Sequence, residues 1–264
     1  GLDVHQLSWR RRQVATLGAG RFRREYPACL ADAFASRGAT WFKAEDLDEV
    51  ATVWFDSPER EMETPKEGAE YVMGVDVAGG VGLDYSTLCV VDISSRQPVY
   101  IERSNTAAPH VWAAKVATIG QLYNQALVLA ESNNHGFALL RELEHLRYPH
   151  LWANADGSYW YTSKATKLDA YDTLREVVES RIIQRLDQST LQELRSLEVR
   201  RLTPEAPPGL HDDLAMACAL AYRCLRDAPA MMRRRATLNR IDVHKSSLRT
   251  ERNKQKAVPW EMQR

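Results

Sequence analysis

The sequence predicts an α/β fold in which a mixed β-sheet is flanked by helices, and three observations support this fold class. Three short apolar runs of strand length follow one another after residue 70 with few residues between them, which is typical of an antiparallel meander. From residue 109 onward, segments with helical spacing of apolar residues alternate with short apolar runs, as in strands that are joined through helices. The 264 residues are 44% hydrophobic and 27% charged, which is enough apolar material for a buried core.

The individual elements follow from these patterns in chain order. The meander strands are expected at Tyr71–Val77, Ser86–Ile93 and Pro98–Arg103, because each run is apolar and turn-forming residues separate it from the next. After the meander, the pattern predicts helices at Pro109–Tyr123, His135–Leu146, Lys167–Ser180, Thr190–Leu197 and His211–Arg226, and strands at Ala126–Ala130, Leu151–Ala153 and Ile182–Leu186.

The charge and cysteine content exclude several classes of protein. Lysine plus arginine and aspartate plus glutamate both number 35, so the net charge is zero and a uniformly basic DNA-coating protein is excluded. The four cysteines form no Cys-x-x-Cys pair, which argues against a zinc ribbon or a disulfide framework and favours a reducing compartment. The sequence has no run of about 18 apolar residues and no basic-then-apolar leader, so we expect neither a membrane span nor secretion.

Charge is unevenly distributed along the chain and suggests three regions. Acidic residues together with Pro65 and Gly68 mark Glu59–Gly68 as a linker, whereas residues 231–264 carry ten lysines and arginines against three acids. This basic segment, which includes Arg233, Arg234 and Arg235, either holds DNA electrostatically or serves a protein partner. The expected regions are an N-terminal extension and linker at 1–66, the main domain at 67–227 and a basic C-terminal tail at 228–264.

Acidic residues stand at the ends of several predicted core elements. Asp76 lies near the end of the first strand, Glu131 directly follows the strand at 126–130, and Asp212 and Asp213 open the last helix. Like charges that approach one another repel unless a cation neutralises them, so a joint site would suit a hard, oxygen-ligated divalent ion such as Mg²⁺ or Mn²⁺. The alternative is structural, because aspartates at strand ends form turns, and Asp212 or Asp213 can cap the helix.

The glycine-rich stretch after Asp76 is not a phosphate-binding loop of the P-loop type. Gly79, Gly80 and Gly82 are followed by no Gly-Lys-Ser/Thr, and the pattern G-x-x-x-x-G-K-[ST] occurs nowhere in the sequence, so we expect no ATP site of that type in this chain. Asp84 follows shortly afterwards, at the start of the second strand. A hairpin would return it close to Asp76, where it would act as a supporting carboxylate.

Four motifs, taken in order, resemble the nuclease domain of a tailed-bacteriophage terminase large subunit, which has an RNase H-like fold. They are GVDVAGGVGLDYS at 74–86, LVLAESNNHG at 127–136, TSKATKLDAYDTLREVV at 162–178 and GLHDDLAMACALA at 209–221. The Glu-x-Asn-Asn-x-Gly string and the His-Asp-Asp start of the last helix are specific in combination. Glu25-Tyr26-Pro27 and Ala33-Phe34 also resemble the segment that follows the motor ATPase in this family, so the similarity covers about 22–227.

This resemblance implies a metal-dependent DNA endonuclease. Asp76, Glu131 and Asp213 would be its catalytic, metal-binding acids, and Asp84 and Asp212 would be supporting acids near the metals. Two divalent ions roughly 3.5–4 Å apart, Mg²⁺ or Mn²⁺, would activate a water and stabilise the leaving 3′ oxygen during phosphodiester hydrolysis.

The sequence departs from the family pattern at two points in this predicted site. Family members often have aspartate at the position of Glu131, and the longer glutamate side chain would alter the metal spacing. Many also carry an aspartate a few residues into the last helix, where this chain has Met216 and Ala217, so a fourth ligand is missing there. Lys164 and Lys167, near the start of a predicted helix, would contact a DNA phosphate; solvated helix-surface lysines are the alternative.

The resemblance also implies a substrate and partners. The substrate would be concatemeric double-stranded viral DNA, cut during genome packaging in the host cytoplasm. The partners of the full-length protein would be a motor ATPase domain, which this chain lacks, the terminase small subunit, and the portal or procapsid. Three other interpretations remain open: a different RNase H-like nuclease such as a resolvase or transposase, a sugar-kinase-like or actin-like nucleotide-binding domain, and a non-catalytic packaging module.

Overall fold

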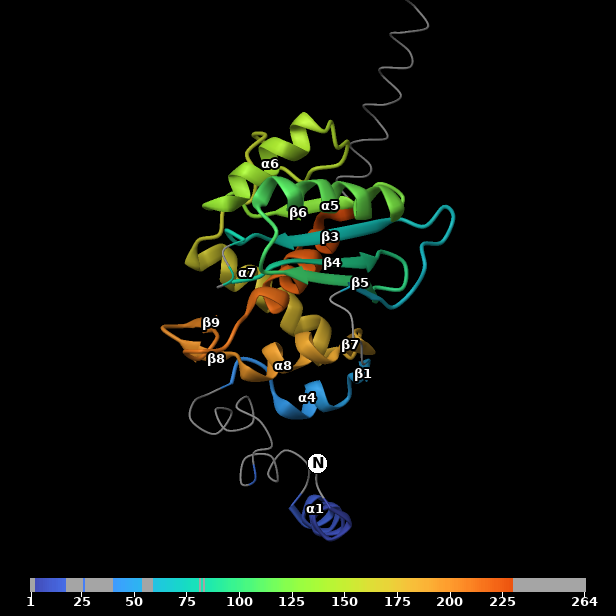
Figure 1. Ribbon diagram of the computed structural model, residues 1–264, viewed down its shortest axis with the longest axis vertical. Coiled ribbons are helices and arrows are strands. Elements are labelled where there is room, and N and C mark those ends of the chain that lie inside the picture. Colours follow the sequence, from blue (N-terminus) through green and yellow to red (C-terminus); the bar gives the residue numbers. More distant parts are fainter. Residues whose placement is uncertain are drawn as a thin grey trace, which may run out of the picture. The chain divides into compact units, whose positions relative to one another are not determined.

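A five-stranded mixed sheet between helices forms the centre of the molecule (Figure 1). The computed structural model describes residues 3–17, 26, 40–53, 59–80, 82 and 84–229. The chain divides into two units, Gly1–Leu225 and Arg226–Arg264, and only residues 226–229 of the second unit, which are helical, are described. None of the helices in the described ranges is long and apolar enough to cross a membrane.

The predicted meander is present, with one parallel strand beside it. The sheet consists of β2 (Glu59–Glu61), β3 (Tyr71–Asp76), β4 (Ser86–Asp92), β5 (Pro98–Ser104) and β6 (Leu127–Ala130). Its strand order is β2-β5-β4-β3-β6. β3 pairs antiparallel with β4 and parallel with β6, while β5 pairs antiparallel with β4 and with β2. The mixed sheet is therefore confirmed, and β2 extends it into the segment that the sequence predicts as a linker.

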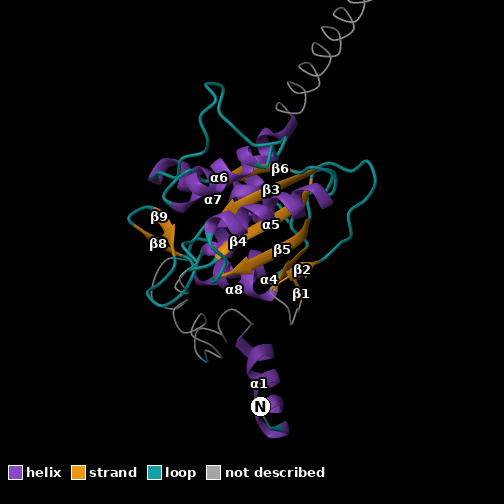
Figure 2. Cartoon of the chain, turned by 45° about the horizontal axis from the view of Figure 1, so that its top comes forward, coloured by secondary structure: helices purple, strands orange, loops and turns teal. Residues whose placement is uncertain are grey.

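Helices cover both faces of this sheet. The described helices are α1 (Val4–Leu17), α4 (Ala44–Asp48), α5 (Pro109–Leu122), α6 (His135–His145), α7 (Lys164–Glu179), α8 (Gln188–Ser196) and the helix of residues 213–229, called the last helix below. α5 and α6 lie against one face, and the last helix crosses the other (Figures 1 and 2). α7 packs beside the last helix, where Arg223 Nε donates to Asp169 Oδ2 at 2.6 Å.

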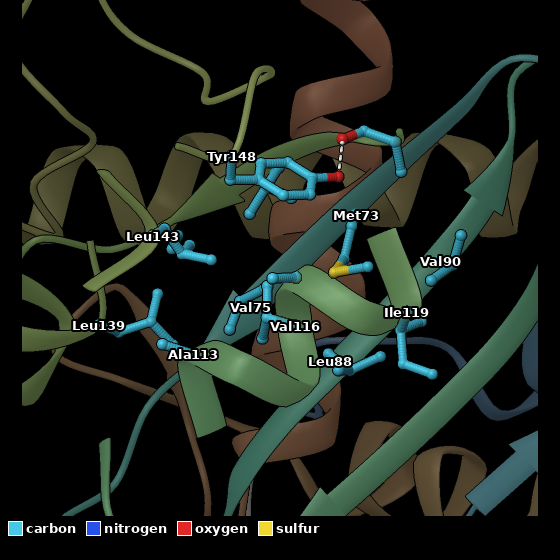
Figure 3. Close-up of a cluster of buried hydrophobic side chains, with 14 of the residues drawn as sticks. Met73, Val75, Leu88, Val90, Ala113, Val116, Ile119, Leu139, Leu143 and Tyr148 are labelled. Atoms are coloured by element: carbon cyan, nitrogen blue, oxygen red, sulfur yellow. Dashed lines mark hydrogen bonds between the residues drawn. The ribbon is translucent and has the colours of Figure 1, made fainter. Parts of the chain in front are cut away.

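The main core lies between the sheet and the pair α5–α6. Alternate residues along a strand point to opposite faces, and Met73, Val75, Leu88 and Val90 all point toward α5 and α6 (Figure 3). There they meet helix residues that are fully or nearly fully buried: Ala113, Val116, Ile119, Leu139 and Leu143. The same alternation places the other residues of β3 and β4 on the face of the last helix.

Smaller elements complete the fold, and here the structure differs from some sequence predictions. β1 (Ala51–Val53) pairs parallel with β7 (Arg185–Asp187), and β8 (Glu198–Arg200) forms a hairpin with β9 (Thr203–Glu205). The patterns in the sequence predict β7, which follows the apolar Ile182 and Ile183, but not β1, β8 or β9, where three residues alone carry too little periodicity. The strand expected at Leu151–Ala153 is reduced to a single bridge between Leu151 and Val128.

Candidate metal centre

The alternation of side chains along three strands brings the predicted acids onto one face. Asp76 is opposite Thr87 in the β3–β4 ladder, and Thr87 Oγ1 donates a hydrogen bond to the carbonyl oxygen of Asp213 at 2.8 Å. Ala130 at the end of β6 belongs to the core on the α5–α6 side, so Glu131 continues on the side of the last helix. Acids that are far apart in sequence therefore meet at the carboxyl ends of β3 and β6.

Two glycines allow the helices to approach these strand ends closely. A Cβ on Gly74 would lie 2.1 Å from the carbonyl oxygen of Ala217, so only glycine lets the last helix rest directly on β3. A Cβ on Gly136 would lie 1.9 Å from the carbonyl oxygen of Glu131, so the first turn of α6 can fold back over the end of β6. The glycine of the Glu-x-Asn-Asn-x-Gly motif is thus a packing requirement next to a candidate ligand.

The side chain of Asp213 is held by contacts from the segment before β4 and from the residues before the last helix. Its Oδ2 accepts a hydrogen bond from the Tyr85 amide at 3.1 Å and lies 3.5 Å from His211 Nδ1. Burial, with Asp212 and Asp84 adding repulsion, raises the pKa of Asp213 to about 6, although the Tyr85 amide and His211 act in the opposite direction. The carboxylate is therefore oriented by the backbone before β4 and is harder to ionise than an ordinary aspartate.

Asp76 lies among several other acids of this site. Its Oδ1 accepts a hydrogen bond from the Val77 amide at 2.9 Å. Burial raises the pKa of Asp76 well above its ordinary value, and repulsion from Glu131, Asp213 and Asp212 raises it further. The carboxylates of Glu131, Asp213 and Asp212 therefore lie near enough to Asp76 to act on its charge.

The segment that carries Glu131 is fixed by a neighbouring loop. Glu131 forms a parallel bridge with Trp160, and the amide of Ser132 donates to the carbonyl oxygen of Trp160 at 2.7 Å. The side chain of Asn133 donates to the carbonyl oxygen of Thr162 at 2.8 Å and accepts from the Thr162 amide at 2.7 Å. The asparagine of the motif therefore ties the end of β6 to the residues before α7.

The other predicted site residues have different positions. Asp212 lies in the cluster, and its Oδ2 is 3.0 Å from Lys167 Nζ, so this lysine reaches the acids instead of pointing to solvent. Asp84 is exposed but close enough to raise the pKa of Asp213. Lys164 is exposed at the first turn of α7. The three predicted DNA-binding arginines, Arg233, Arg234 and Arg235, lie outside the described residues.

Two residues near the acids are not predicted from the sequence. Burial raises the pKa of Glu193 on α8 to about 8, and Asp213 and Asp212 add to this effect. Tyr171 on α7 is fully buried, and its hydroxyl has no hydrogen-bond partner in the described part of the chain. Burial and the nearby Asp212 and Glu193 raise the pKa of Tyr171 well above its ordinary value. In the sequence, Glu193 stands between Leu191 and Leu194, which are both buried; this position indicates only weakly that Glu193 is partly buried as well.

The aromatic residues at 152–161 are divided between the core and the surface. Trp152 and Trp160 are buried and contact each other edge to face, with ring centroids 5.6 Å apart. Tyr161 is 64% exposed, and together with Phe137, which is 59% exposed, it lines a groove of about 710 Å³ that begins at Ser132 beside Glu131. Exposed aromatic faces such as these are suited to stacking on planar rings, including nucleobases.

The carboxylate oxygens of these acids are chemically suited to a hard divalent cation. Their side chains, however, do not converge on one point as a complete ligand set. Carboxylate oxygens are the ligands that Mg²⁺ and Mn²⁺ prefer. Within the described ranges, however, no group of three or more His, Cys, Asp or Glu side chains is placed to hold a metal ion. Asp213 and Asp212 are engaged by the Tyr85 amide and by Lys167, so metal binding at this site requires these side chains to turn toward one another.

Comparisons with known proteins agree on the fold. The large terminase nuclease of the thermophilic phage G20c, solved with bound magnesium, is 22% identical over 71% of this chain and 97% of its own, with a TM-score of 0.61. The large terminase nuclease domain of Thermus phage P74-26 is 23% identical over 68% of this chain and 93% of its own, with a TM-score of 0.58. No protein-family model matches the chain. The predicted RNase H-like fold is therefore confirmed by these structures.

Proposed function

We propose that this chain is the nuclease part of a tailed-bacteriophage terminase large subunit, a metal-dependent endonuclease that cleaves concatemeric double-stranded viral DNA during genome packaging. The observation that carries the proposal is the placement of Asp76 at the end of β3, Glu131 directly after the neighbouring parallel strand β6, and Asp213 at the start of the last helix, bonded through its carbonyl oxygen to Thr87 opposite Asp76. The shared fold supports it, because the G20c nuclease was solved with bound magnesium, cobalt and zinc.

The chemistry of the site follows from its donors. Asp76, Glu131 and Asp213 would hold two divalent ions, Mg²⁺ or Mn²⁺, with Asp84 and Asp212 as supporting acids. Bound ions would supply charge neutralisation and Lewis acidity for phosphodiester hydrolysis. The chain itself orients Asp213 through the Tyr85 amide and Thr87, and it keeps Glu131 in place through the loop at Trp160.

DNA would reach this site along a surface that combines cations and aromatic rings. Lys164 is exposed on the first turn of α7, Lys167 reaches into the acids, and Tyr161 and Phe137 line the groove beside Glu131. Arg233, Arg234 and Arg235 would add phosphate contacts from the basic tail. In the full-length protein, the nuclease would work with a motor ATPase domain, the small subunit and the portal or procapsid in the host cytoplasm.

Cleavage of supercoiled plasmid tests the proposal directly. The wild-type chain should nick and linearise plasmid in millimolar Mn²⁺ or Mg²⁺ and should be inactive in EDTA. Glu131→Gln and Asp213→Asn should lower the rate on the order of 100-fold or more, because each removes a charged ligand from the metals. A folded wild-type protein that cuts equally well in EDTA, or that never cuts, would reject the metal-dependent nuclease and leave a non-catalytic packaging module.

A further inference from the structure

The start of the last helix has an unusual arrangement of hydrogen bonds. The first amides of any helix lack partners within the helix, and the side chain of the N-cap residue commonly accepts from the second or third of them. Asp212 is the N-cap residue, because its carbonyl oxygen accepts the first helical bond from the Met216 amide at 2.8 Å. Its carboxylate, however, is bound to Lys167 at 3.0 Å.

Glu193 occupies the place that the N-cap side chain would normally take. Its Oε2 accepts a hydrogen bond from the amide of Ala215 at 3.0 Å, and the amide of Leu214 is bonded to the same carboxylate. These are the second and third amides of the last helix. The acceptor therefore comes from α8, 22 residues earlier in the chain, instead of from the helix's own first residues.

We propose that Glu193 is a positioning residue, which caps the last helix in place of Asp212 and so keeps the carboxylates of Asp212 and Asp213 away from the helix's own amides and available to a metal ion. The role of the metal site in cleavage rests on the function proposed above. Thr87 fixes the backbone of Asp213 from the β4 side, with 2.8 Å between its Oγ1 and the carbonyl oxygen of Asp213. Glu193 fixes the same turn from α8, so the two contacts together hold the backbone that carries the acids.

A comparison of Glu193→Ala with Glu193→Gln tests this role through metal binding. Without the cap, the carboxylate of Asp212 is free to turn back to its own helix, and the site loses an acid. In a thermal-shift titration, Glu193→Ala should raise the Mn²⁺ concentration at half-maximal stabilisation about tenfold or more. Glu193→Gln keeps an oxygen acceptor for the Ala215 amide and should recover most of the wild-type midpoint. Plasmid cleavage should follow the same order.

The matched control is Asp92→Ala. Asp92 also accepts hydrogen bonds from two backbone amides, those of Ser94 and Ser95, but at the opposite end of the β3–β4 hairpin. This variant should lower the melting temperature while leaving the Mn²⁺ midpoint unchanged. If Glu193→Ala behaves like Asp92→Ala, with a lower melting temperature and an unchanged midpoint, the cap is merely structural and the proposal is overturned.

A second readout does not depend on metal and separates this proposal from the nuclease assignment. In EDTA, Asp212→Ala should lower the melting temperature more in a Glu193→Ala background than in the wild type, because Asp212 has then become the cap. Equal changes in the two backgrounds would overturn the capping argument. A wild type that shows neither Mn²⁺ stabilisation nor cleavage would reject the nuclease function, and this double-variant comparison would still decide the role of Glu193.

Discussion

The two faces of the β3–β4 hairpin each carry an aspartate, Asp92 buried and Asp76 partly buried, and the surroundings of the two differ sharply. Asp92 is opposite Tyr71, whose ring belongs to the core under α5 and α6. It is only 4% exposed, and its Oδ1 accepts hydrogen bonds from the Ser94 and Ser95 amides at 2.7 and 3.0 Å. A carboxylate that is bonded to turn amides in this way stabilises the fold.

Asp76, on the face of the last helix, has one amide bond and three acidic neighbours. Like charges in a partly buried position lower the stability of the metal-free protein, so a structural role alone does not explain their arrangement. The charges of its neighbours therefore set Asp76 apart from Asp92.

The largest expected effect comes from exchanging each of these aspartates for asparagine. Asp76→Asn should reduce Mn²⁺-dependent plasmid cleavage on the order of 100-fold or more. It should also raise the melting temperature of the metal-free protein by roughly 2–4 °C at neutral pH, which corresponds to about 1 kcal/mol in a domain of this size, because repulsion is relieved.

Asp92→Asn should show the opposite pair of results. Cleavage should stay within about twofold of the wild type, whereas unfolding in urea should show a loss of about 1 kcal/mol because the bonds to the Ser94 and Ser95 amides lose their charge. Cleavage by Asp76→Asn at the wild-type rate would contradict the proposed role of Asp76 in the metal site. An Asp92→Asn variant without cleavage activity would contradict the purely structural role of Asp92.

The acids on the face of the last helix should also give the metal-free protein an unusual dependence of stability on pH. The pKa of Asp213 is raised from 3.8 to about 6 and that of Glu193 from 4.5 to about 8, in both cases mainly by burial. Between the ordinary and the raised value, the folded state holds more protons than the unfolded state, so stability falls as pH rises. This contribution is fully present below about pH 4 and is lost through pH 6 and then pH 8.

Urea unfolding in EDTA between pH 5 and pH 9 measures this loss. Asp213 alone should account for on the order of 2 kcal/mol after allowance for solvent screening, and Asp213→Asn should remove the part near pH 6. Millimolar Mn²⁺ should reverse the trend, because the cation binds the ionised carboxylates. Stability that increases over this pH range in EDTA would show that folding does not raise the pKa values of Asp213 and Glu193.

Most of the fold and the predicted acids could be read from the sequence. The apolar run at 71–76 predicts β3 and places Asp76 at its end, and the small residues after Asp213 predict a helix that packs closely. Gly74 explains why that helix comes so near, but this contact is visible only in three dimensions. The expected strands and helices of the central domain therefore appear within a few residues of their predicted ends, with the segment at 151–153 as the exception.

Glu193 and the pairing of Lys167 could not be predicted, because both depend on tertiary contacts. α8 has the periodicity of a surface helix, and nothing local shows that one of its glutamates meets the amides of a helix that begins 20 residues later. Lys167 lies on the first turn of α7, where a solvated lysine is the ordinary expectation, yet it bonds to Asp212. Local sequence pattern identifies the helices, the strands and the acids at strand ends. It does not identify residues whose hydrogen-bond or ion-pair partners lie on another element.

The smallest expected effect concerns two buried tyrosines on the same two faces. Tyr148, on the α5–α6 side, donates its hydroxyl to the carbonyl oxygen of Ala126 at 2.6 Å (Figure 3). Tyr171, beside the acids, is fully buried, but its hydroxyl has no hydrogen-bond partner among the described residues. A buried hydroxyl without a partner loses its bonds to water and gains nothing in exchange.

Exchange of each tyrosine for phenylalanine should therefore give opposite signs. Tyr148→Phe leaves the Ala126 carbonyl without its donor and should lower the free energy of unfolding by about 1–2 kcal/mol. Tyr171→Phe removes a desolvated group and should be neutral or stabilising by up to about 1 kcal/mol, with cleavage unchanged. Urea unfolding in EDTA measures both. A loss of stability in Tyr171→Phe as large as that in Tyr148→Phe would mean that the Tyr171 hydroxyl is bonded in solution, and that the face of the last helix satisfies its polar groups as fully as the other face does.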